Sequence, residues 1–213
     1  MHMEFVPLLL SVVSLLLSVT VAWLTLFRRG KLGMTQPMLI GFLYENEQPK
    51  VFFRTILFAT GKRGYIIEAL YIKVRNGEST QTFNFWMYGE TKELKIGSGL
   101  RVGDDGVSSN HHFLPPKDAP TFAFLAGEYT IDAYARILNR NAQMLLSTVK
   151  LTLSHDLAAA LNDRTMLSDH TMGVLFTWRP DSQHYRGEVS APVATEGRSR
   201  SVSGAGRGKL PWA

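Results

Sequence analysis

The chain has 213 residues, of which 45% are hydrophobic and 19% are charged, a composition typical of a folded protein and not of a disordered one. Its net charge of +5 lies in the flanks, because residues 1–35 carry +2, residues 190–213 carry +3 and residues 36–189 are neutral. The neutral middle argues against a nucleic-acid-binding domain, and the absence of cysteine excludes disulfides and cysteine-ligated metal sites.

The first predicted element is a membrane-spanning helix over residues 6–27, which follows a short tail at residues 1–5. These 22 residues contain no charged side chain. A helix of this length is roughly 33 Å long, enough to cross a hydrocarbon core of about 30 Å. A cleaved signal peptide is the alternative, but it would need basic residues before an apolar run of about 7–15 residues. The tail has no Lys or Arg and the run is longer, so the pattern favours an uncleaved anchor.

The orientation of this helix is predicted from the basic linker that follows it, residues 28–36. Arg28, Arg29 and Lys31 lie just after the span, and no Lys or Arg precedes it. Cytoplasmic flanks of membrane helices are enriched in Lys and Arg. The sequence therefore predicts a single-pass protein of the inner cell membrane, with its N-terminus outside and its C-terminal domain in the cytoplasm.

Hydroxylated residues recur along one face of the predicted helix, at Ser11, Ser14, Ser18 and Thr25. Small hydroxylated residues let membrane helices approach closely, and their hydroxyls can bond across the interface. They can equally bond the backbone of their own helix one turn back. Association with a second helix through this face and local bonding within the helix both stay open.

Residues 37–154 alternate between strand-like runs and turn signals, and they predict one antiparallel β-sandwich. The runs are rich in β-branched and aromatic residues, and Asn76 with Gly77 forms a hairpin-turn dipeptide. The last run has one buried face by its alternation, with one parity holding Leu145, Val149, Leu151 and Leu153 and the other Thr148, Lys150 and Thr152. The predicted strands cover residues 38–44, 51–60, 65–75, 80–89, 93–103, 107–114, 128–138 and 142–154.

The stretch "LAGEYTIDAYARIL", residues 125–138, resembles the penultimate strand of immunoglobulin-like and fibronectin-like sandwiches. In those families a tyrosine corner places a Tyr at the start of this strand, and its hydroxyl bonds backbone a few residues upstream. Tyr129 stands in that place, so the resemblance implies an Ig-like fold with a structural role for this side chain. It implies no activity.

The chain after the sandwich is predicted to add a short helix and a hairpin, packed on the sandwich over residues 155–189. Residues 155–163 read as the helix, with Asp156 as its cap. Residues 172–189 read as a hairpin that turns at 179–182 and extends a sheet edge. Residues 190–213, rich in Ser, Gly and Arg, are predicted to be a disordered basic tail.

The sequence contains no recognised catalytic motif and predicts no cofactor and no metal site. His111 and His112 are adjacent on a predicted strand and therefore point to opposite faces, so they could not both ligate one metal without a bulge. Asp104, Asp105 and Gly106 are better explained as a tight turn than as a calcium site.

Trp86, Tyr88 and Trp178 form the candidate recognition surface. Both faces of residues 83–88 are apolar or aromatic, whereas a half-exposed strand should be polar on one face. Either the hairpin after residue 172, which contains Trp178, covers this strand, or Trp86 and Tyr88 are exposed to a partner. Cover from within the chain is the favoured interpretation.

Together these features predict a non-enzymatic, membrane-anchored β-sandwich that serves as an interaction or scaffold subunit of a membrane-associated assembly. Its predicted partners are the lipid bilayer and another protein, with a second copy of the chain left open. Two alternatives remain: a glycan- or peptide-binding module outside the membrane that uses Trp86 and Tyr88, and a membrane-tethered hydrolase that uses the histidine pair.

Overall fold

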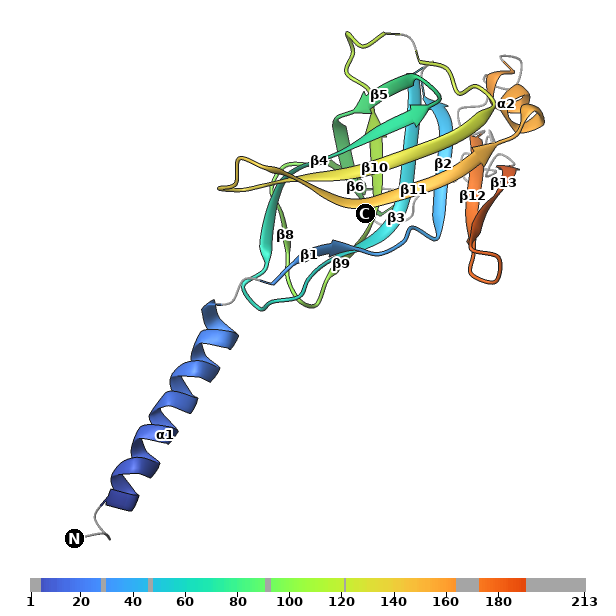
Figure 1. The fold of residues 1–213 in the computed structure, drawn as a ribbon. Coiled ribbons are helices and arrows are strands. Elements are labelled where there is room, and N and C mark those ends of the chain that lie inside the picture. The colour runs from blue at the N-terminus through green and yellow to red at the C-terminus, as the bar shows by residue number, and fades with distance from the viewer. Residues whose placement is uncertain are drawn as a thin grey trace, which may run out of the picture.

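The computed structural model describes residues 5–27, 30–45, 48–90, 93–120, 122–163 and 173–190. An N-terminal helix, α1 (Phe5–Ala22), continues as a π-helical turn, η1 (Trp23–Phe27), and precedes two antiparallel β-sheets (Figure 1). The all-β fold class predicted from the sequence, with one apolar helix before the strands and one short helix after them, is therefore confirmed. The predicted N-terminal tail is described only at Phe5, and Arg28, Arg29 and residues 191–213 of the predicted basic tail lie outside the described residues.

The large sheet has eight strands, and seven of them follow the order β13-β12-β2-β3-β9-β6-β7 while β1 pairs with β3. Its strands are β1 (Leu32–Met34), β2 (Leu39–Glu45), β3 (Gln48–Ala59), β6 (Phe85–Glu90), β7 (Glu93–Ile96), β9 (Val107–Leu114), β12 (Gly173–Arg179) and β13 (His184–Ser190). β1 forms inside the predicted linker, with Leu32 opposite Ala59. The predicted C-terminal hairpin, β12 and β13, extends the sheet by pairing with β2.

The small sheet has five strands, four of them in the order β11-β10-β4-β5 while β8 pairs with β4. Its strands are β4 (Tyr65–Asn76), β5 (Ser79–Phe83), β8 (Leu100–Val102), β10 (Gly127–Ile137) and β11 (Gln143–Leu153). The C-terminal half of β11 has the exposure predicted from its alternation, because Val149, Leu151 and Leu153 are buried while Lys150 and Thr152 are exposed. The prediction is wrong for Leu145, which is 52% exposed, because the register with β10 shifts between Ala133 and Tyr134 and reverses the alternation.

Two predicted strands are each divided between the sheets. The run at 80–89 ends in the small sheet at Phe83 and restarts in the large sheet at Phe85, with Asn84 between the two strands. The run at 93–103 likewise separates into β7 and β8, which belong to different sheets. A chain that changes sheets has to leave one ladder before it joins the other, so the alternation of a single strand does not continue across the break.

The core lies between the sheets and is dominated by aromatic rings. The ring of Phe42 on β2 lies 4.6 Å from that of Phe124, 5.3 Å from Tyr129 on β10 and 5.1 Å from Phe176 on β12 (centroid distances). All four side chains are almost completely buried. Offset and edge-on aromatic pairs at these separations add to the stabilisation from buried area, so Phe42 links both sheets and the C-terminal hairpin.

Tyr129 makes the hydrogen bond that defines a tyrosine corner. Its hydroxyl donates to the carbonyl oxygen of Leu125 at 2.7 Å, and its ring is buried in the core. The bond joins the start of β10 to the connection that precedes it, as the resemblance to Ig-like sandwiches implies.

The short helix α2 (His155–Asn162) begins two residues earlier than its predicted cap, Asp156, requires. Its N-cap is Ser154, whose Oγ accepts a hydrogen bond from the amide of Leu157 at 3.3 Å. Asp156 lies in the first turn instead, where the positive end of the helix dipole stabilises a carboxylate. The helix buries Ala158 and Leu161 in the core.

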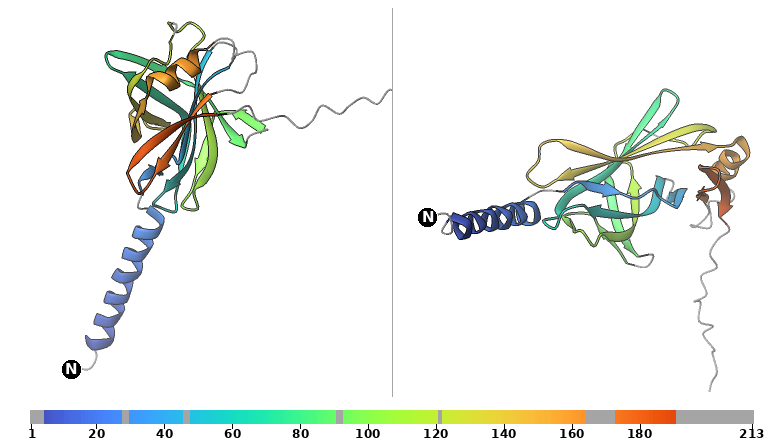
Figure 2. Two further views of the ribbon diagram at one scale, coloured as in Figure 1. Left: turned by 90° about the vertical axis from the view of Figure 1, so that its right-hand side faces the viewer. Right: turned by 60° about the horizontal axis from the view of Figure 1, so that its bottom comes forward.

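α1 projects away from the sandwich in all the ribbon views (Figures 1 and 2) and buries none of its residues. The span Phe5–Thr25 has a mean hydropathy of 2.4 and is 0% buried. By length and composition it could cross a membrane, as the sequence predicts.

Replacing Tyr129 with Phe removes one hydroxyl and keeps the buried ring. We expect the free energy of unfolding to fall by about 1 kcal/mol, because the bond from Tyr129 is lost while the carbonyl of Leu125 still accepts from Nδ2 of Asn76 at 3.2 Å. Urea unfolding of the detergent-solubilised chain, followed by near-ultraviolet circular dichroism, measures this change. Tyr134→Phe is the control, since the described residues give its hydroxyl no hydrogen-bond partner; equal losses in the two variants would contradict the tyrosine corner.

Candidate protein-interaction surface

The hydroxyl face of α1 bonds its own backbone. Ser11 Oγ donates to the carbonyl of Pro7 at 2.9 Å, Ser18 Oγ to that of Ser14 at 2.8 Å, and Thr25 Oγ1 to that of Val21 at 2.7 Å. These are the one-turn-back bonds that make a hydroxyl tolerable in an apolar helix. Because a hydroxyl oxygen can still accept a second bond, association of helices through this face stays a prediction.

Trp86 lies inside the sandwich. The residue is 3% exposed, and its Nε1 donates to Nδ1 of His111 at 3.1 Å. Its ring stacks on those of Tyr88 and His111, with centroids 5.0 and 6.0 Å away. Gly97 covers the indole from the segment after β7, where a Cβ atom would lie 2.0 Å from the ring. Trp86 is therefore a core residue whose indole N–H has a hydrogen-bond acceptor within the fold.

Trp178 lies far across the large sheet from Trp86. It packs against Tyr185 in the C-terminal hairpin, with ring centroids 5.0 Å apart, and β2, β3 and β9 separate β12 from β6 in the sheet order. The recognition surface predicted from Trp86, Tyr88 and Trp178 is corrected, because Trp86 is buried. The favoured interpretation, cover from within the chain, is right for Trp86, but the cover does not come from Trp178. The parity argument failed because the chain changes sheets at Asn84, so Phe83 faces the core and Phe85 faces outward.

His111 and His112 lie on opposite faces of β9. His111 is completely buried beside Trp86, and His112 is half-buried on the outer face. Burial, with a smaller contribution from His112, lowers the pKa of His111 from 6.5 to about 4, so the ring is neutral at pH 7. Nε2 of His111 has no hydrogen-bond partner among the described residues. Over the described ranges no group of three or more His, Asp or Glu side chains could hold a metal ion.

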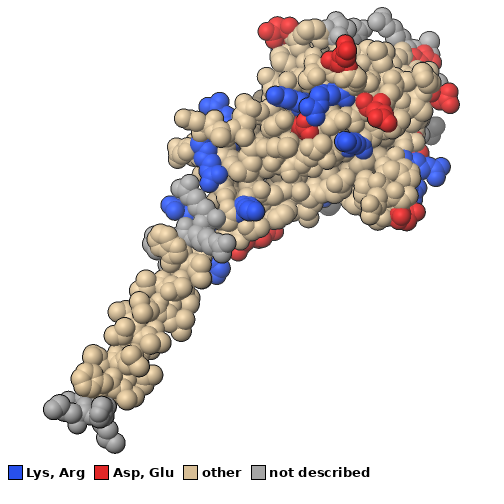
Figure 3. Space-filling view, viewed as in Figure 1, with Lys and Arg blue, Asp and Glu red and all other residues tan. Residues whose placement is uncertain are grey.

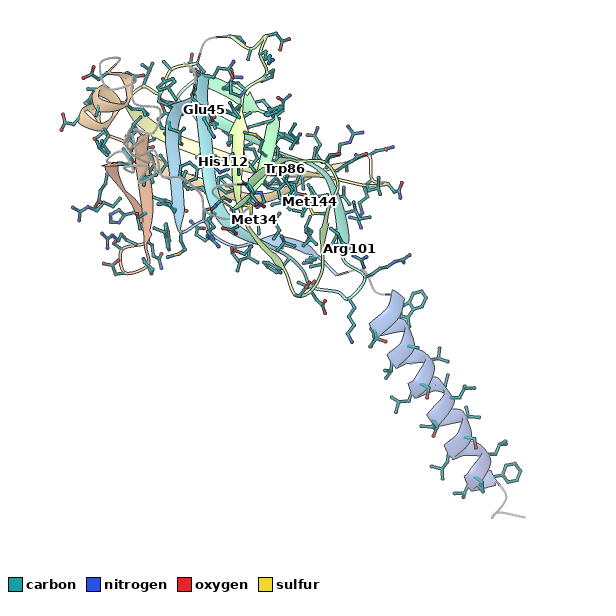
Figure 4. The ribbon with its side chains drawn as sticks, turned by 180° about the vertical axis from the view of Figure 1, so that it is seen from behind. Met34, Glu45, Trp86, Arg101, His112 and Met144 are labelled. Carbon is teal, nitrogen blue, oxygen red and sulfur yellow. The ribbon has the colours of Figure 1, made fainter. Side chains whose placement is uncertain are left out.

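The outer face of the large sheet carries an apolar strip that crosses four strands. Ile96 pairs with Met87, Met87 with His112, and His112 with Phe52, so these side chains follow one another across β7, β6, β9 and β3. With Phe85, they are called the outer strip below. Ile96 is 70% exposed and Phe85 is 44% exposed, whereas the other members are half-buried. Figure 4 labels His112 beside Trp86, on the strand next to β6.

The inner end of the outer strip is built by stacking. The rings of Phe52 and His112 are nearly parallel, 17° apart, with centroids at 5.4 Å. On the other side, Phe52 lies over Gly41, where a Cβ atom would come within 1.9 Å of the ring. Glycine at this position is therefore what lets the phenyl ring lie flat on the sheet.

Charged pairs border the outer strip. Lys50, which is 6% exposed, pairs with Glu45, and Arg54 lies 3.7 Å from Glu90 on β6. Burial and the positive charge of Lys50 lower the pKa of His112 to about 4, although Glu45 partly opposes this effect. His112 is therefore neutral at pH 7, and the outer strip carries no charge. The two ion pairs at its border each combine one positive and one negative side chain.

β7 adds a sheet edge to this surface. It is the last strand of the large sheet, with β6 as its neighbour. Its four residues include Glu93 and Lys95, charges of the kind that discourage uncontrolled pairing of an exposed edge. Ile96 thus lies where the exposed apolar face meets a free edge.

Comparisons with known proteins give only distant similarities. No protein-family model and no curated protein matches the sequence. The CooA pilin subunit of enterotoxigenic Escherichia coli is 10% identical, with a TM-score of 0.30, and the match covers 58% of this chain and 97% of that chain. ACE19, the collagen-binding subdomain of the Enterococcus faecalis surface protein ACE, is 14% identical, with a TM-score of 0.20, over 56% of this chain and 99% of that chain.

Acidification should destabilise the sandwich through His111. Its pKa is 6.5 in an unfolded chain and about 4 in the fold, so the unfolded state binds more protons between these values. The free energy of unfolding should then fall as the pH is lowered through this window, by roughly 3 kcal/mol for this residue alone. Tryptophan fluorescence during urea unfolding at a series of pH values measures the slope.

The controls for this prediction are two substitutions. His111→Gln keeps an acceptor for the indole of Trp86 and removes the titrating ring, so its slope should be markedly shallower than that of the unmodified chain. The exposed His184→Gln should leave the slope unchanged. An unaltered slope in His111→Gln would show that other groups control the acid sensitivity.

Proposed function

We propose that this chain is a non-enzymatic, single-pass membrane protein whose β-sandwich binds another protein through the outer strip. The observation that carries the proposal is the exposure of Ile96 and Phe85 at one end of an uncharged apolar strip. A contiguous apolar surface in contact with water is unfavourable, and in folded proteins such surfaces commonly mark interaction sites.

The composition of the surface favours a protein as the partner. Interfaces between proteins combine an apolar centre, rich in aromatic residues and methionine, with a polar rim. Phe52, Phe85 and Met87 would supply the centre, and the Lys50–Glu45 and Arg54–Glu90 pairs would supply a rim of both signs. The partner we propose is therefore an apolar surface with charges of both signs at its border, and β7 offers a free edge beside it.

Membrane attachment is the second part of the proposal. The apolar span Phe5–Thr25 would act as the anchor, and Arg28, Arg29 and Lys31 would hold the sandwich on the cytoplasmic side. A protein confined to a membrane meets its membrane-bound partners at a raised effective concentration. A modest surface such as the outer strip could then support association.

The alternatives find less support in the described residues. A glycan- or peptide-binding surface built on Trp86 would need that ring at the surface, and the residue is 3% exposed. A hydrolase built on the histidine pair would need both rings in one site, and they face opposite sides of β9. A second copy of the chain stays open as the partner, through either the outer strip or the hydroxyl face formed by Ser11, Ser14 and Ser18 of α1 and Thr25 of η1.

Site-directed photo-crosslinking in cells tests the proposed surface. A photoreactive amino acid at Ile96 or Phe85 should give discrete crosslinked products, because both side chains lie on the outer strip. Leu125 and Leu145 are comparably exposed apolar residues away from the strip, and the same amino acid there should give none. The mass of the product then distinguishes a second copy of the chain from a different protein.

A charge in the strip provides the matched test. Met87→Asp should remove the crosslinks from Ile96, because it places a carboxylate in the middle of the strip, between Ile96 and His112. Leu145→Asp should leave them intact. Crosslinks of equal yield from Ile96 and Leu145, or crosslinks that survive Met87→Asp in a folded variant, would contradict the outer strip as the binding surface.

A further inference from the structure

Basic side chains from separate segments gather at the end of the sandwich next to α1. Two reciprocal bonds place Lys31: its amide donates to Oγ1 of Thr60 at 2.7 Å, and the amide of Thr60 donates to the carbonyl of Lys31 at 2.9 Å. Thr60 begins the turn from β3 to β4, which carries Lys62 and Arg63. Lys31, a few residues after the apolar helix, is thus fixed beside a basic turn.

Tyr65 and its neighbours bring two more cations to the same end. The hydroxyl of Tyr65 donates to the carbonyl of Gly30, and the guanidinium of Arg140 lies over its ring, 5.5 Å from the centroid. Ile66, the next residue, pairs with Arg101 on β8. Lys31, Lys62, Arg63, Arg101 and Arg140 are called the basic collar below.

The charges of the basic collar are available to an external partner. Four of the five residues are exposed and Arg140 is half-buried, and among the described residues none of the five belongs to an ion pair. The acidic residues at this end are Asp104 and Asp105, in the turn that follows the Ala59–Gly103 backbone bond. Figure 3 shows blue side chains around the end from which α1 projects, and Figure 4 labels Arg101 there.

This asymmetry is hidden in the overall charge. Residues 36–189 hold 16 basic and 16 acidic residues. Of these, Lys62, Arg63, Arg101 and Arg140 lie in the collar and Asp104 and Asp105 lie beside it, which leaves 12 basic and 14 acidic residues elsewhere. The domain is neutral as a whole but positive at the end next to α1. A negatively charged surface near that end would therefore orient the domain by electrostatic attraction.

We propose that the basic collar binds the anionic headgroups of the bilayer that α1 crosses. The inference rests on the membrane anchor proposed above. The collar begins at Lys31, a few residues after the apolar span, so the chain itself would hold these cations at the headgroup level, within a Debye length of about 10 Å. Clustered Lys and Arg next to a membrane helix are attracted to anionic lipid. The contact would fix the orientation of the sandwich, and with it the direction in which the outer strip faces.

The test uses the full chain reconstituted in vesicles of phosphatidylcholine alone, or with about one third phosphatidylglycerol. Because the chain has no cysteine, Asn141→Cys places a single fluorophore next to Arg140, and Ser79→Cys places one at the β4–β5 turn at the other end. A quencher attached to lipid headgroups reports their proximity. Phosphatidylglycerol should increase quenching of the label at 141, high salt should reverse the increase, and the label at 79 should not respond.

Charge reversal provides the matched control. Lys62→Glu with Arg63→Glu should shift the equilibrium between the lipid-bound and free orientations of the collar by about tenfold toward the free one. Lys117→Glu with Lys150→Glu reverses two exposed charges away from the collar and should leave the quenching unchanged. All four sites are at the surface, so circular dichroism should report the same fold for both variants.

The outcomes separate the collar from the anchor. A chain that fails to float with the vesicles would contradict the proposed anchor and the collar together. A chain that floats, but whose label at 141 is quenched equally in both lipid mixtures, would contradict the collar alone and leave an acidic protein as the candidate for this surface. Equal effects of the two double substitutions would also overturn the inference.

Discussion

The packing of aromatic rings between the sheets determines which side of each strand in the large sheet faces inward. Phe42 contacts Phe124, Tyr129 and Phe176 at centroid distances of 4.6–5.3 Å. In the same layer Phe53 pairs with His111 across β3 and β9. A one-residue slip of register would move each of these rings to solvent. The side chains that must face the core therefore determine which side chains of the large sheet face outward.

The outer strip is a consequence of that constraint. With His111 inside, His112 must point outward, and the register then aligns it with Met87 and Phe52. Both histidines remain neutral at pH 7, because burial lowers each pKa to about 4. Strand alternation and burial together leave an apolar, uncharged surface that ends at the free edge of β7.

Gly30 and Lys31, which precede β1, are hydrogen-bonded to the sandwich. β1, inside the predicted basic linker, pairs with β3, and hydrogen bonds join Gly30 to Tyr65 and Lys31 to Thr60. Because of these bonds, the end of the sandwich that contains Tyr65 and Thr60 is the end nearest the helix. The basic collar lies at that end, and the outer strip lies on the outer face of the large sheet.

Sequence reasoning succeeded where the determinants were local. Neighbouring residues were enough to predict the turn at Asn76 and Gly77, the C-terminal hairpin, the corner residue Tyr129 and the alternation of β11 from Val149 to Leu153. The alternation fails at Leu145, where the register with β10 shifts. The outer strip could not, because it depends on the register between β7, β6, β9 and β3.

The sheet change at Asn84 was the decisive missed feature. The sequence did carry a signal, since both faces of residues 83–88 are apolar, but only the break explains why Phe83 is buried and Phe85 is exposed. The collar was missed for a related reason: its cations are far apart in the sequence and cancel in the total charge of residues 36–189.

The central claim is that α1 holds the sandwich against the cytoplasmic face of the membrane. Labelling of Ser79→Cys by a membrane-impermeant thiol reagent tests it most directly, because this exposed site at the β4–β5 turn would carry the chain's single thiol. The account predicts no labelling in intact cells and full labelling once the membrane is permeabilised. Labelling in intact cells would place the sandwich outside and contradict it.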